Sequence, residues 1–295
     1  YIFLSVDGKK IYYVEEDSIY KLEYIFTSNE IKKLGYNLKD DYISLKPYGI
    51  KLENIYFDIT IAEYLIDSMS STSYECSAIA MKYLTKKVKT KEELLGKGVK
   101  AKKYQDLSFE ELSSHISQII DTVKSVMPIM EENLKESNMD GLLYHVEMPL
   151  VEVLADMEYE GVKVDKEKLN ELGSQFKEII KKLEREIYEI SGEEFNINSP
   201  KQLGVILFEK LGLPVIKKTK TGYSTNAEVL DKLKDQSPII DKIIEYRQIV
   251  KLNSTYVEGL LSIINPIDGR IHSSFNQTIT TTGRISSTEP NLQNI

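Results

Sequence analysis

Two long stretches in the second half of the sequence carry apolar residues at helical spacing, and they constrain the fold more than any other feature. The first begins at Asp165, a residue that favours the N-cap position, and runs to about Ile190. The second begins near Pro238 and continues until Asn265-Pro266 ends it. Two long helices with a connection between them form an arm and not a pocket.

The connection between the two helices is positively charged at its tip. From Lys210 to Ala227 the chain has four lysines and no acid, and Gly212, Pro214 and Gly222 interrupt it. From Phe195 to Tyr256 there are ten Lys and Arg against six Asp and Glu, although the whole chain has a net charge of -8. Basic blocks of this kind are typical of phosphate contact, and a solvated lysine-rich face is the alternative interpretation.

The first half of the sequence alternates strands and helices. Ile2 to Val6, the turn Asp7-Gly8 and Ile11 to Val14 predict a β-hairpin, and strand 55–57 leads into a helix that ends near Ile66. A further helical pattern covers 40–48. This order favours an α/β layer.

A loop is expected over residues 86–106, followed by a helix that Ser108 and Glu111 open with a reciprocal capping box. The helix is expected to reach about Lys135, with Pro128 as a kink or break. The domain boundary is placed near residues 137–141.

Further boundaries are marked by capping residues and prolines. A helix is expected over 148–159, and capping boxes are expected at Ser199-Pro200-Lys201-Gln202 and at Thr225-Asn226-Ala227-Glu228. Two strand-like stretches, 270–277 and 280–285, follow the second long helix. The 295 residues are enough for about two domains.

Cysteine content and hydropathy give expectations about location. The single cysteine, Cys76, has no intramolecular disulfide partner, and no cysteines and histidines have zinc-site spacing. The sequence has no signal segment and no apolar run of about 18 residues. We therefore expect a cytoplasmic protein without a membrane partner.

The final 16 residues, TTTGRISSTEPNLQNI from Thr280 to Ile295, are the most specific motif in the chain. They resemble the motif that leads into the palm of family A DNA polymerases of the bacterial type. The segments Gly192 to Thr225 and Glu245 to Tyr256 resemble the thumb of the same family. The resemblance implies a 3′–5′ exonuclease-like, ribonuclease H-like α/β domain at 1–135, a linker at 136–144, a mainly helical thumb at 145–264 and the first palm strands at 265–295.

The resemblance also implies the residues that contact DNA. Arg284 is expected in the minor groove at the primer end, with Asn291, Gln293 and Asn294 as amide donors on the template side; amides that cap a loop and an arginine in an internal ion pair are the alternative. Thumb contacts with phosphate are expected from a larger set: Asn196, Ser199, Lys201, Lys217, Lys218, Lys220, Arg247, Lys251, Ser254 and Thr255.

The first half resembles the family's exonuclease domain with its carboxylates incomplete. Asp41 matches the second exonuclease motif and Asp58 lies in the next fitting segment, but the Asp-x-Glu strand of the first motif is absent. His115 and Ile119 stand where the third motif has tyrosine and aspartate, and isoleucine cannot bind a metal ion. Two-metal hydrolysis needs several carboxylates, so we expect no editing activity and no metal bound by this chain.

The resemblance implies that the parent protein is a DNA-directed DNA polymerase, a nucleotidyltransferase of replication and repair that uses Mg²⁺ and deoxynucleoside triphosphates. The catalytic palm aspartates and the fingers are expected beyond Ile295, so this chain is expected to bind primer–template duplex without catalysis. A bacterial, nucleoid-associated monomer is expected. The alternatives are an active exonuclease of the same fold and a noncatalytic DNA-binding module.

Overall fold

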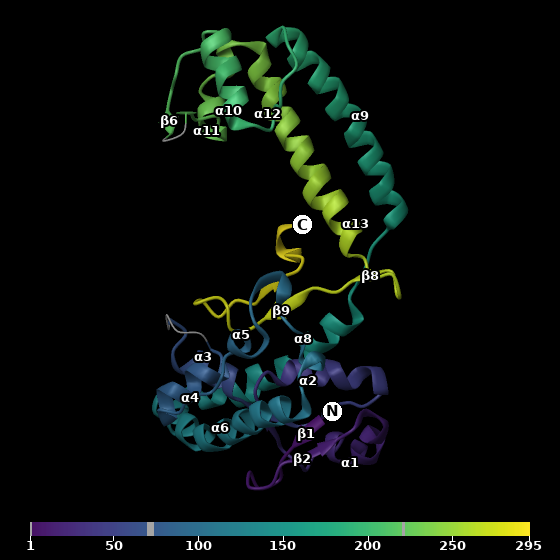
Figure 1. Cartoon of the computed structure of the whole chain (residues 1–295), viewed down its shortest axis with the longest axis vertical. Helices are drawn as coiled ribbons and strands as arrows, with labels where there is room; N and C mark the ends of the chain where they lie inside the picture. Colours follow the sequence, from purple (N-terminus) through teal and green to yellow (C-terminus); the bar gives the residue numbers. More distant parts are fainter. Residues whose placement is uncertain (1, 70–73, 220–221) are drawn as a thin grey trace. The chain divides into compact units, whose positions relative to one another are not determined.

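The chain forms two compact units (Figure 1). The computed structural model describes residues 2–69, 74–219 and 222–295, so the predicted DNA contact Lys220 lies outside the described residues. The first unit combines Tyr1–Gly161 with His272–Asn294, and the second combines Val162–Ile271 with Ile295. The two units are defined by packing within the structure, whereas the predicted domains follow the functional parts of a polymerase. The predicted domain boundaries therefore stay a prediction.

The described part of the first unit contains short strands and mainly helices. In chain order its elements are β1 (Ile2–Leu4), β2 (Tyr12–Val14), α1 (Glu23–Phe26), β3 (Lys33–Gly35), α2 (Leu38–Leu45), β4 (Ile55–Asp58), α3 (Ile59–Ile66), α4 (Cys76–Leu84), α5 (Lys91–Leu95), α6 (Phe109–Glu136), α7 (Asp140–Leu142), α8 (Met148–Glu160), β9 (Ser274–Asn276) and β10 (Ser286–Thr288). β1 pairs with β2 and β9 with β10 in antiparallel fashion, whereas β3 and β4 are parallel.

The predicted N-terminal hairpin is confirmed, with shorter strands than expected. Asp7 accepts hydrogen bonds from the backbone N–H groups of Lys9 and Lys10 at 2.8 and 3.1 Å, and Gly8 has a φ of 67° that glycine adopts without strain. Ser5 accepts from Gly8 N–H and donates to the carbonyl of Lys10. These hydrogen bonds close a loop that is wider than a two-residue turn. The two strands therefore end closer to the chain positions 4 and 12 than predicted.

The core of the first unit forms where α3 and α4 pack against α6. Its fully buried side chains include Phe57, Ile59, Val126, Met130 and Leu134. The predicted strand and helix at 55–66 are confirmed as β4 and α3.

Two predictions in this unit are corrected: Pro128 does not break its helix, and residues 86–106 are not a loop throughout. Helix α6 continues from Phe109 to Glu136 through Pro128, whose exposed ring faces solvent while Val126 and Met130 anchor the other face in the core. The expected loop at 86–106 contains the short helix α5, capped reciprocally by Thr90 and Glu93 with N–H to oxygen distances of 2.9 and 3.0 Å. The capping box of Ser108 is confirmed.

The second unit is mainly helical. Its described elements are β5 (Val162–Lys163), α9 (Lys166–Ser191), α10 (Pro200–Gly204), β6 (Lys218–Thr219), β7 (Gly222–Tyr223), α11 (Ala227–Asp231), α12 (Pro238–Lys251), α13 (Gly259–Ile263) and β8 (Arg270–Ile271). π-helical turns at Val205–Lys210 and Leu252–Glu258 continue α10 and join α12 to α13. The antiparallel pair β5 and β8 closes the unit where the chain enters and leaves it.

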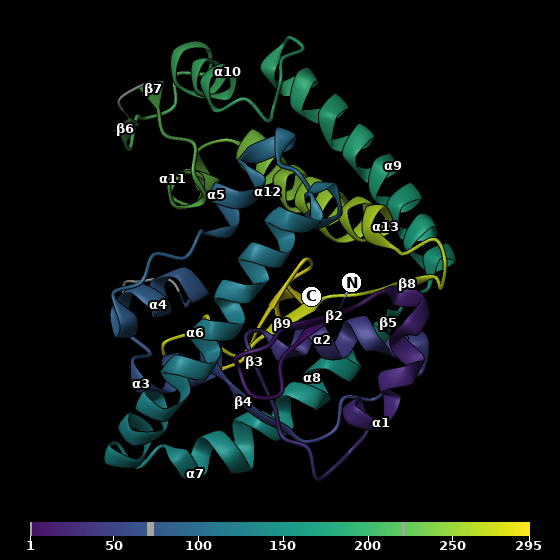
Figure 2. The same cartoon turned by 60° about the horizontal axis from the view of Figure 1, so that its bottom comes forward.

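The two predicted long helices are confirmed as α9 and as α12 with α13, and they lie side by side (Figures 1 and 2). Asp165 caps α9 by accepting from the N–H of Lys168 at 2.9 Å. Leu183 and Ile187 of α9 and Ile240 and Ile243 of α12 belong to one buried cluster. Because the helices bury their apolar stripes on each other, the arm is a rigid pair.

The two predicted capping boxes of this unit form differently. Ser199 accepts from the N–H of Gln202 at 3.4 Å, but the Gln202 side chain accepts from Asn196 N–H at 2.7 Å and does not reach back. At the second position the cap is Asn226, which accepts from the N–H of Val229 at 3.0 Å. Thr225 is displaced from capping because Arg247 binds it.

Among the described residues, no helix has both the length and the apolar character that a membrane crossing requires.

Candidate nucleic-acid interface

The C-terminal motif forms a hairpin whose loop, residues 277–285, replaces the expected second strand. β9 pairs with β10, so the strand that pairs after the loop begins at Ser286 and not at Thr280. The expectation of a strand at 280–285 is therefore wrong. Hydrogen bonds from the rest of the first unit hold this segment as a loop.

Buried hydroxyls fix the base of the hairpin. The hydroxyl oxygens of Ser273 and Ser287 lie 2.7 Å apart, and Ser273 donates to the carbonyl of Pro290 at 2.6 Å. Ser287 accepts from the N–H of Leu292 at 3.1 Å. The backbone that carries the motif's amide residues is therefore tied to the strands.

The loop itself is held by a tyrosine that the sequence did not single out. The hydroxyl of Tyr64, on α3, donates to the carbonyl of Thr280 at 2.7 Å and accepts from the N–H of Gly283 at 3.1 Å. The Thr280 hydroxyl donates to the carbonyl of Arg284 at 2.5 Å, and Gly283 has a φ of 75°. These bonds fix the peptide groups that precede Arg284.

The side chain of Arg284 is exposed, and within the described part of the chain it has no hydrogen-bond or ion-pair partner. Asn291, Gln293 and Asn294 are also exposed. Gln293 donates to the carbonyl of Ile285 at 2.9 Å, and Asn291 accepts from the N–H of Gln293 at 3.0 Å. Their roles toward DNA stay predictions, but the arginine is not sealed in a protein ion pair.

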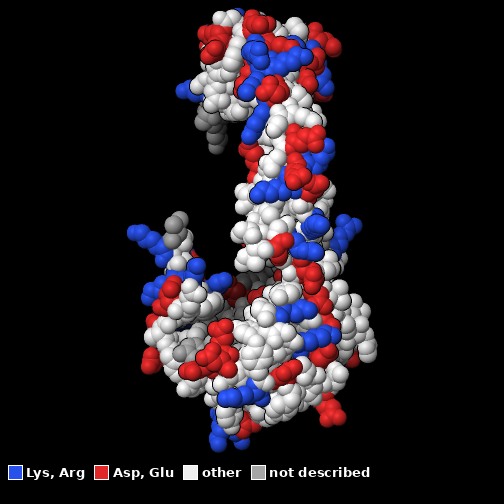
Figure 3. All heavy atoms as spheres, turned by 90° about the vertical axis from the view of Figure 1, so that its right-hand side faces the viewer, with Lys and Arg blue, Asp and Glu red and all other residues white. Residues whose placement is uncertain are grey.

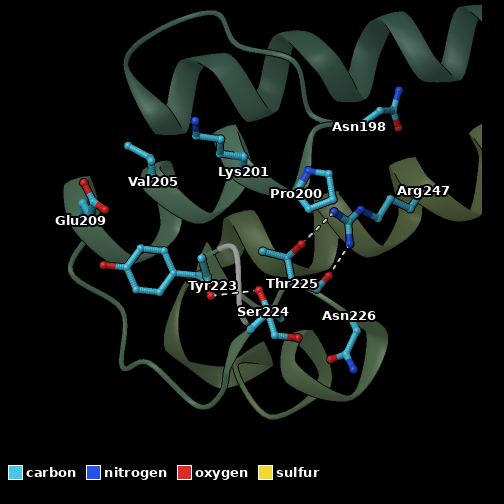
Figure 4. Close-up of a pocket in the computed structure, with 12 residues that line it drawn as sticks. Asn198, Pro200, Lys201, Val205, Glu209, Tyr223, Ser224, Thr225, Asn226 and Arg247 are labelled. Atoms are coloured by element: carbon cyan, nitrogen blue, oxygen red, sulfur yellow. Dashed lines mark hydrogen bonds between the residues drawn. The ribbon is translucent and has the colours of Figure 1, made fainter.

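The second unit has a hollow of about 640 Å³ near its tip, and two of its lining residues, Lys201 and Arg247, are predicted DNA contacts (Figure 4). The guanidinium of Arg247 donates to the carbonyl of Thr225 and, at 3.2 Å, to its hydroxyl. The lining comprises Asn198, Pro200, Lys201, Val205, Glu209, Thr219, Gly222, Tyr223, Ser224, Thr225, Asn226 and Arg247. Partial burial lowers the pKa of Arg247, which nevertheless stays charged because arginine titrates far above neutrality.

The other described basic residues predicted to contact phosphate point into solvent. Lys201, Lys217, Lys218 and Lys251 are exposed, and no carboxylate in the described part of the chain forms an ion pair with them. Lys218 lies 5.9 Å from the ring centroid of Tyr223. These ammonium groups are available to an anion.

The remaining predicted thumb contacts lie on helix ends. Ser254 and Thr255 are exposed in the π-helical turn that begins where α12 ends. Asn196 accepts from the N–H of Asn198 at 3.0 Å, and Ser199 caps α10. Because Asn196 and Ser199 order the start of α10, any contact with phosphate adds to a structural role.

Helix α9 of the second unit carries charges of both signs. Figure 3 shows Lys and Arg interspersed with Asp and Glu over the face that this view presents. On α9, Lys168, Lys181 and Lys182 pair with acids three or four residues away. A surface of mixed sign gives little net attraction for a polyanion. Lys217 and Lys218, which have no ion-pair partner among the described residues, are therefore the better candidates.

The two carboxylates predicted as remnants of an exonuclease site have different surroundings. Asp58 is buried at the N-cap of α3, where its oxygens accept from the N–H groups of Leu38 and Thr60 at 2.7 and 2.8 Å. Burial raises its pKa, and these backbone bonds oppose the rise. The carboxylate thus connects β4, α2 and α3.

Asp41 lies on α2, close enough to Asp58 for the two carboxylates to repel each other. Desolvation, followed by the negative charges of Asp58 and Asp40, raises the pKa of Asp41 to about 7. The residue retains an exposed surface, so water offsets part of the desolvation.

The third-motif positions hold one residue that could bind a metal ion, His115, and one that cannot, Ile119. His115 is buried on α6, its Nδ1 has no hydrogen-bond partner, and burial lowers its pKa, while Ile119 packs against the core. Residues 2–69, 74–219 and 222–295 contain no group of three or more His, Cys, Asp or Glu side chains arranged to hold a metal ion.

Sequence reasoning missed several residues that organise the C-terminal hairpin. Besides Tyr64, these are Glu158, Lys39 and Glu147, which bind backbone or amide groups of Phe275 and Gln277. The only local signal was a polar group within an apolar helix, as with Tyr64 among Ile61, Ala62 and Leu65. Contacts that span more than 100 residues leave no periodic pattern.

Two family models match the two parts of the chain. The model of the ribonuclease H-like domain of DNA polymerase I matches residues 2–126, and that of DNA polymerase family A matches residues 166–295. The chain belongs to DNA polymerase family A, with a ribonuclease H-like domain followed by a helical polymerase region.

The curated relatives are bacterial DNA polymerases I. The chain is 43% identical to DNA polymerase I of Geobacillus stearothermophilus over 90% of its own length and 30% of the relative. It is 42% identical to DNA polymerase I of Bacillus subtilis over 99% of its own length and 33% of the relative. The chain therefore spans about a third of the length of these relatives.

A solved structure agrees with this assignment. The POL domain of Pol1 from M. smegmatis, in complex with DNA primer–template and dNTP, superposes with a TM-score of 0.79 at 30% identity. The match covers 96% of this chain and 46% of that one.

Proposed function

We propose that this chain holds the primer–template duplex within a DNA-directed DNA polymerase, which adds deoxynucleotides to a primer 3′ end in replication and repair. Family membership supports the activity. The role of this chain is inferred chiefly from Arg284, an exposed cation that has no ion-pair partner among the described residues. It lies on a loop whose preceding peptide groups are fixed by hydrogen bonds.

The C-terminal hairpin supplies donors suited to the minor groove. Purine N3 and pyrimidine O2 are acceptors at nearly the same place in every Watson–Crick pair, so a donor there tests pair geometry without reading sequence. Arg284 offers a planar fork of N–H donors, and the amides of Asn291 and Asn294 offer further ones. A mispaired primer end displaces these acceptors and weakens the contact.

The second unit supplies contacts with the phosphate backbone. Lys201, Lys217, Lys218 and Lys251 are ammonium groups without a carboxylate partner among the described residues, and each one that neutralises a phosphate releases condensed counterions. Such contacts fix the position of a duplex but carry no sequence information. A polymerase that copies templates of any sequence needs contacts of this kind, because they hold the duplex without selecting a sequence.

Metal ions and triphosphates belong to the proposal for the whole polymerase and not to this chain's own residues. Mg²⁺ would require several carboxylates in one cleft, whereas the Asp58 oxygens already accept backbone N–H groups. No described group of three potential ligands is available. We therefore assign no metal-dependent step to the side chains that the structure describes. We further propose that the polymerase is a monomer in the bacterial cytoplasm and is associated with the nucleoid.

The test is binding of a fluorescently labelled primer–template by this chain, measured by anisotropy. Arg284→Ala is expected to weaken binding to a paired primer end by about 1–3 kcal/mol, the energy of a good bidentate base contact. The matched control is Arg185→Ala, which removes an exposed arginine from α9 and should leave affinity unchanged. Equal affinity of wild type and Arg284→Ala would overturn the proposed contact.

A further inference from the structure

The segment that carries Arg284 is held by the rest of the first unit at three places. Glu158 accepts from the N–H of Phe275 at 2.6 Å, and Lys39 donates to the carbonyl of the same residue at 2.6 Å. Glu147 accepts from the Gln277 amide at 2.6 Å. Tyr64 makes the third attachment, and it is the one within the loop itself.

Tyr64 is buried, and its hydroxyl group supports this loop from one side. Its side chain is 3% exposed, and its ring lies edge-on to Tyr74 with centroids 5.8 Å apart and an interplanar angle of 88°. The hydroxyl at the end of the ring donates to one peptide group of the loop and accepts from another, three residues later. The tyrosine side chain rotates about two bonds, and the packing of its buried ring restricts rotation about both.

We propose that Tyr64 is a positioning residue that sets the direction of Arg284, so that the ribonuclease H-like domain contributes to recognition of the primer end. This inference rests on the proposed function of the C-terminal hairpin. Tyr64 does not touch DNA in this scheme. It acts through the carbonyl of Thr280 and the N–H of Gly283, the residue immediately before Arg284.

Among the described residues, two further hydrogen bonds restrain the loop next to Arg284. Gln293 donates to the carbonyl of Ile285, which follows Arg284 and leaves the Gly283 side of the loop unrestrained. The other joins the Thr280 hydroxyl to the Arg284 carbonyl, and it depends on the same Thr280 backbone that Tyr64 holds. Without the hydroxyl, Gly283 is free to leave its left-handed conformation, because glycine has many accessible alternatives. The guanidinium would then sample several directions and would discriminate paired from mispaired ends less well.

Tyr64→Phe tests this because it removes only the hydroxyl and keeps the ring. Tyr74→Phe is the matched control, since its hydroxyl donates to the carbonyl of Asp67 and not to the loop. Anisotropy with a matched and a mismatched primer end gives a discrimination ratio for each variant. Tyr64→Phe is expected to lower this ratio about threefold to tenfold, whereas Tyr74→Phe leaves it unchanged.

A double variant separates positioning from general structural support. If Tyr64 acts through Arg284, adding Tyr64→Phe to Arg284→Ala changes the ratio no further. Equal effects of Tyr64→Phe and Tyr74→Phe on the ratio, or additive effects in the double variant, would overturn the inference.

Hydrogen exchange of the Gly283 amide provides a readout that does not require DNA. Exchange is expected to become faster in Tyr64→Phe and to stay unchanged in Tyr74→Phe, and unchanged exchange in both would contradict the geometry on which the inference rests. If Arg284→Ala does not affect DNA binding while Gly283 exchange responds as expected, the proposed function fails. If Arg284→Ala weakens binding and Tyr64→Phe does not alter discrimination, the positioning role alone fails.

Discussion

Glu158, in the last turn of α8, accepts the backbone N–H of Phe275 at 2.6 Å and pairs with Lys39 of α2. The Glu158 side chain is 11% exposed and that of Lys39 is 19% exposed, so the bonds are shielded from water. One carboxylate therefore ties a helix of the first half of the chain to a strand near its C-terminus.

Glu158→Ala should destabilise the first unit by about 2–4 kcal/mol, because it leaves a partly buried ammonium and a backbone N–H without their partner. Urea unfolding followed by hydrogen exchange of β9 amides would measure the change. Glu178→Ala, which removes an exposed partner of Lys181, should cost less than about 1 kcal/mol. Similar losses for both variants would contradict the anchoring role.

Replacing Lys217 and Lys218 together with Gln should make DNA binding less sensitive to salt. If each lysine neutralises one phosphate, the slope of log affinity against log salt falls in magnitude by about 0.9 per lysine. The control is Lys177→Gln on α9, whose ammonium lies 3.4 Å from Glu258. A slope equal to wild type in the double variant would exclude these lysines from the contact.

No degradation of a labelled single strand is expected when Mg²⁺ or Mn²⁺ is added to the chain, because Asp58 is engaged by backbone N–H groups and Ile119 offers no ligand. Gel analysis over a time course would show this. Digestion that is lost in Asp41→Asn would demonstrate an active exonuclease and restore the alternative function.

The stability of the first unit should depend on the protonation of Asp41. Its pKa is raised to about 7 in the folded chain, against about 3.9 for an unperturbed carboxyl, so the folded state binds more protons between these values. The contribution to stability is present in full below pH 4 and is lost as the pH rises toward 7.

Asp41→Asn should therefore flatten the fall in unfolding free energy between about pH 4 and pH 7. Denaturant midpoints across this range would measure the difference from wild type. Asp7→Asn is a useful comparison of opposite sign, since backbone N–H groups lower the pKa of Asp7. An unchanged profile in Asp41→Asn would show that solvent cancels the shift.

Local signals in the sequence predicted the helices well where a cap and an apolar stripe coincide. Asp165 and Ser108 open α9 and α6 as expected, since a capping side chain needs only the backbone of its own first turn. Local signals failed where a distant group competes for the same residue. Thr225 was expected to cap α11, but Arg247 takes its carbonyl and hydroxyl, and Asn226 becomes the cap.

The sequence by itself determined the family, the long helical arm and the basic connection between its helices, because each depends on residue type and short-range spacing. The tertiary structure decided that Arg284 and the amide residues of the final motif are exposed. Tertiary structure alone decided that residues 277–285 form a loop and which groups hold it. Tyr64 lies more than 200 positions before Thr280 and Gly283 in the sequence. Bonds of that span depend on how the core packs, and hydrophobic periodicity does not specify them.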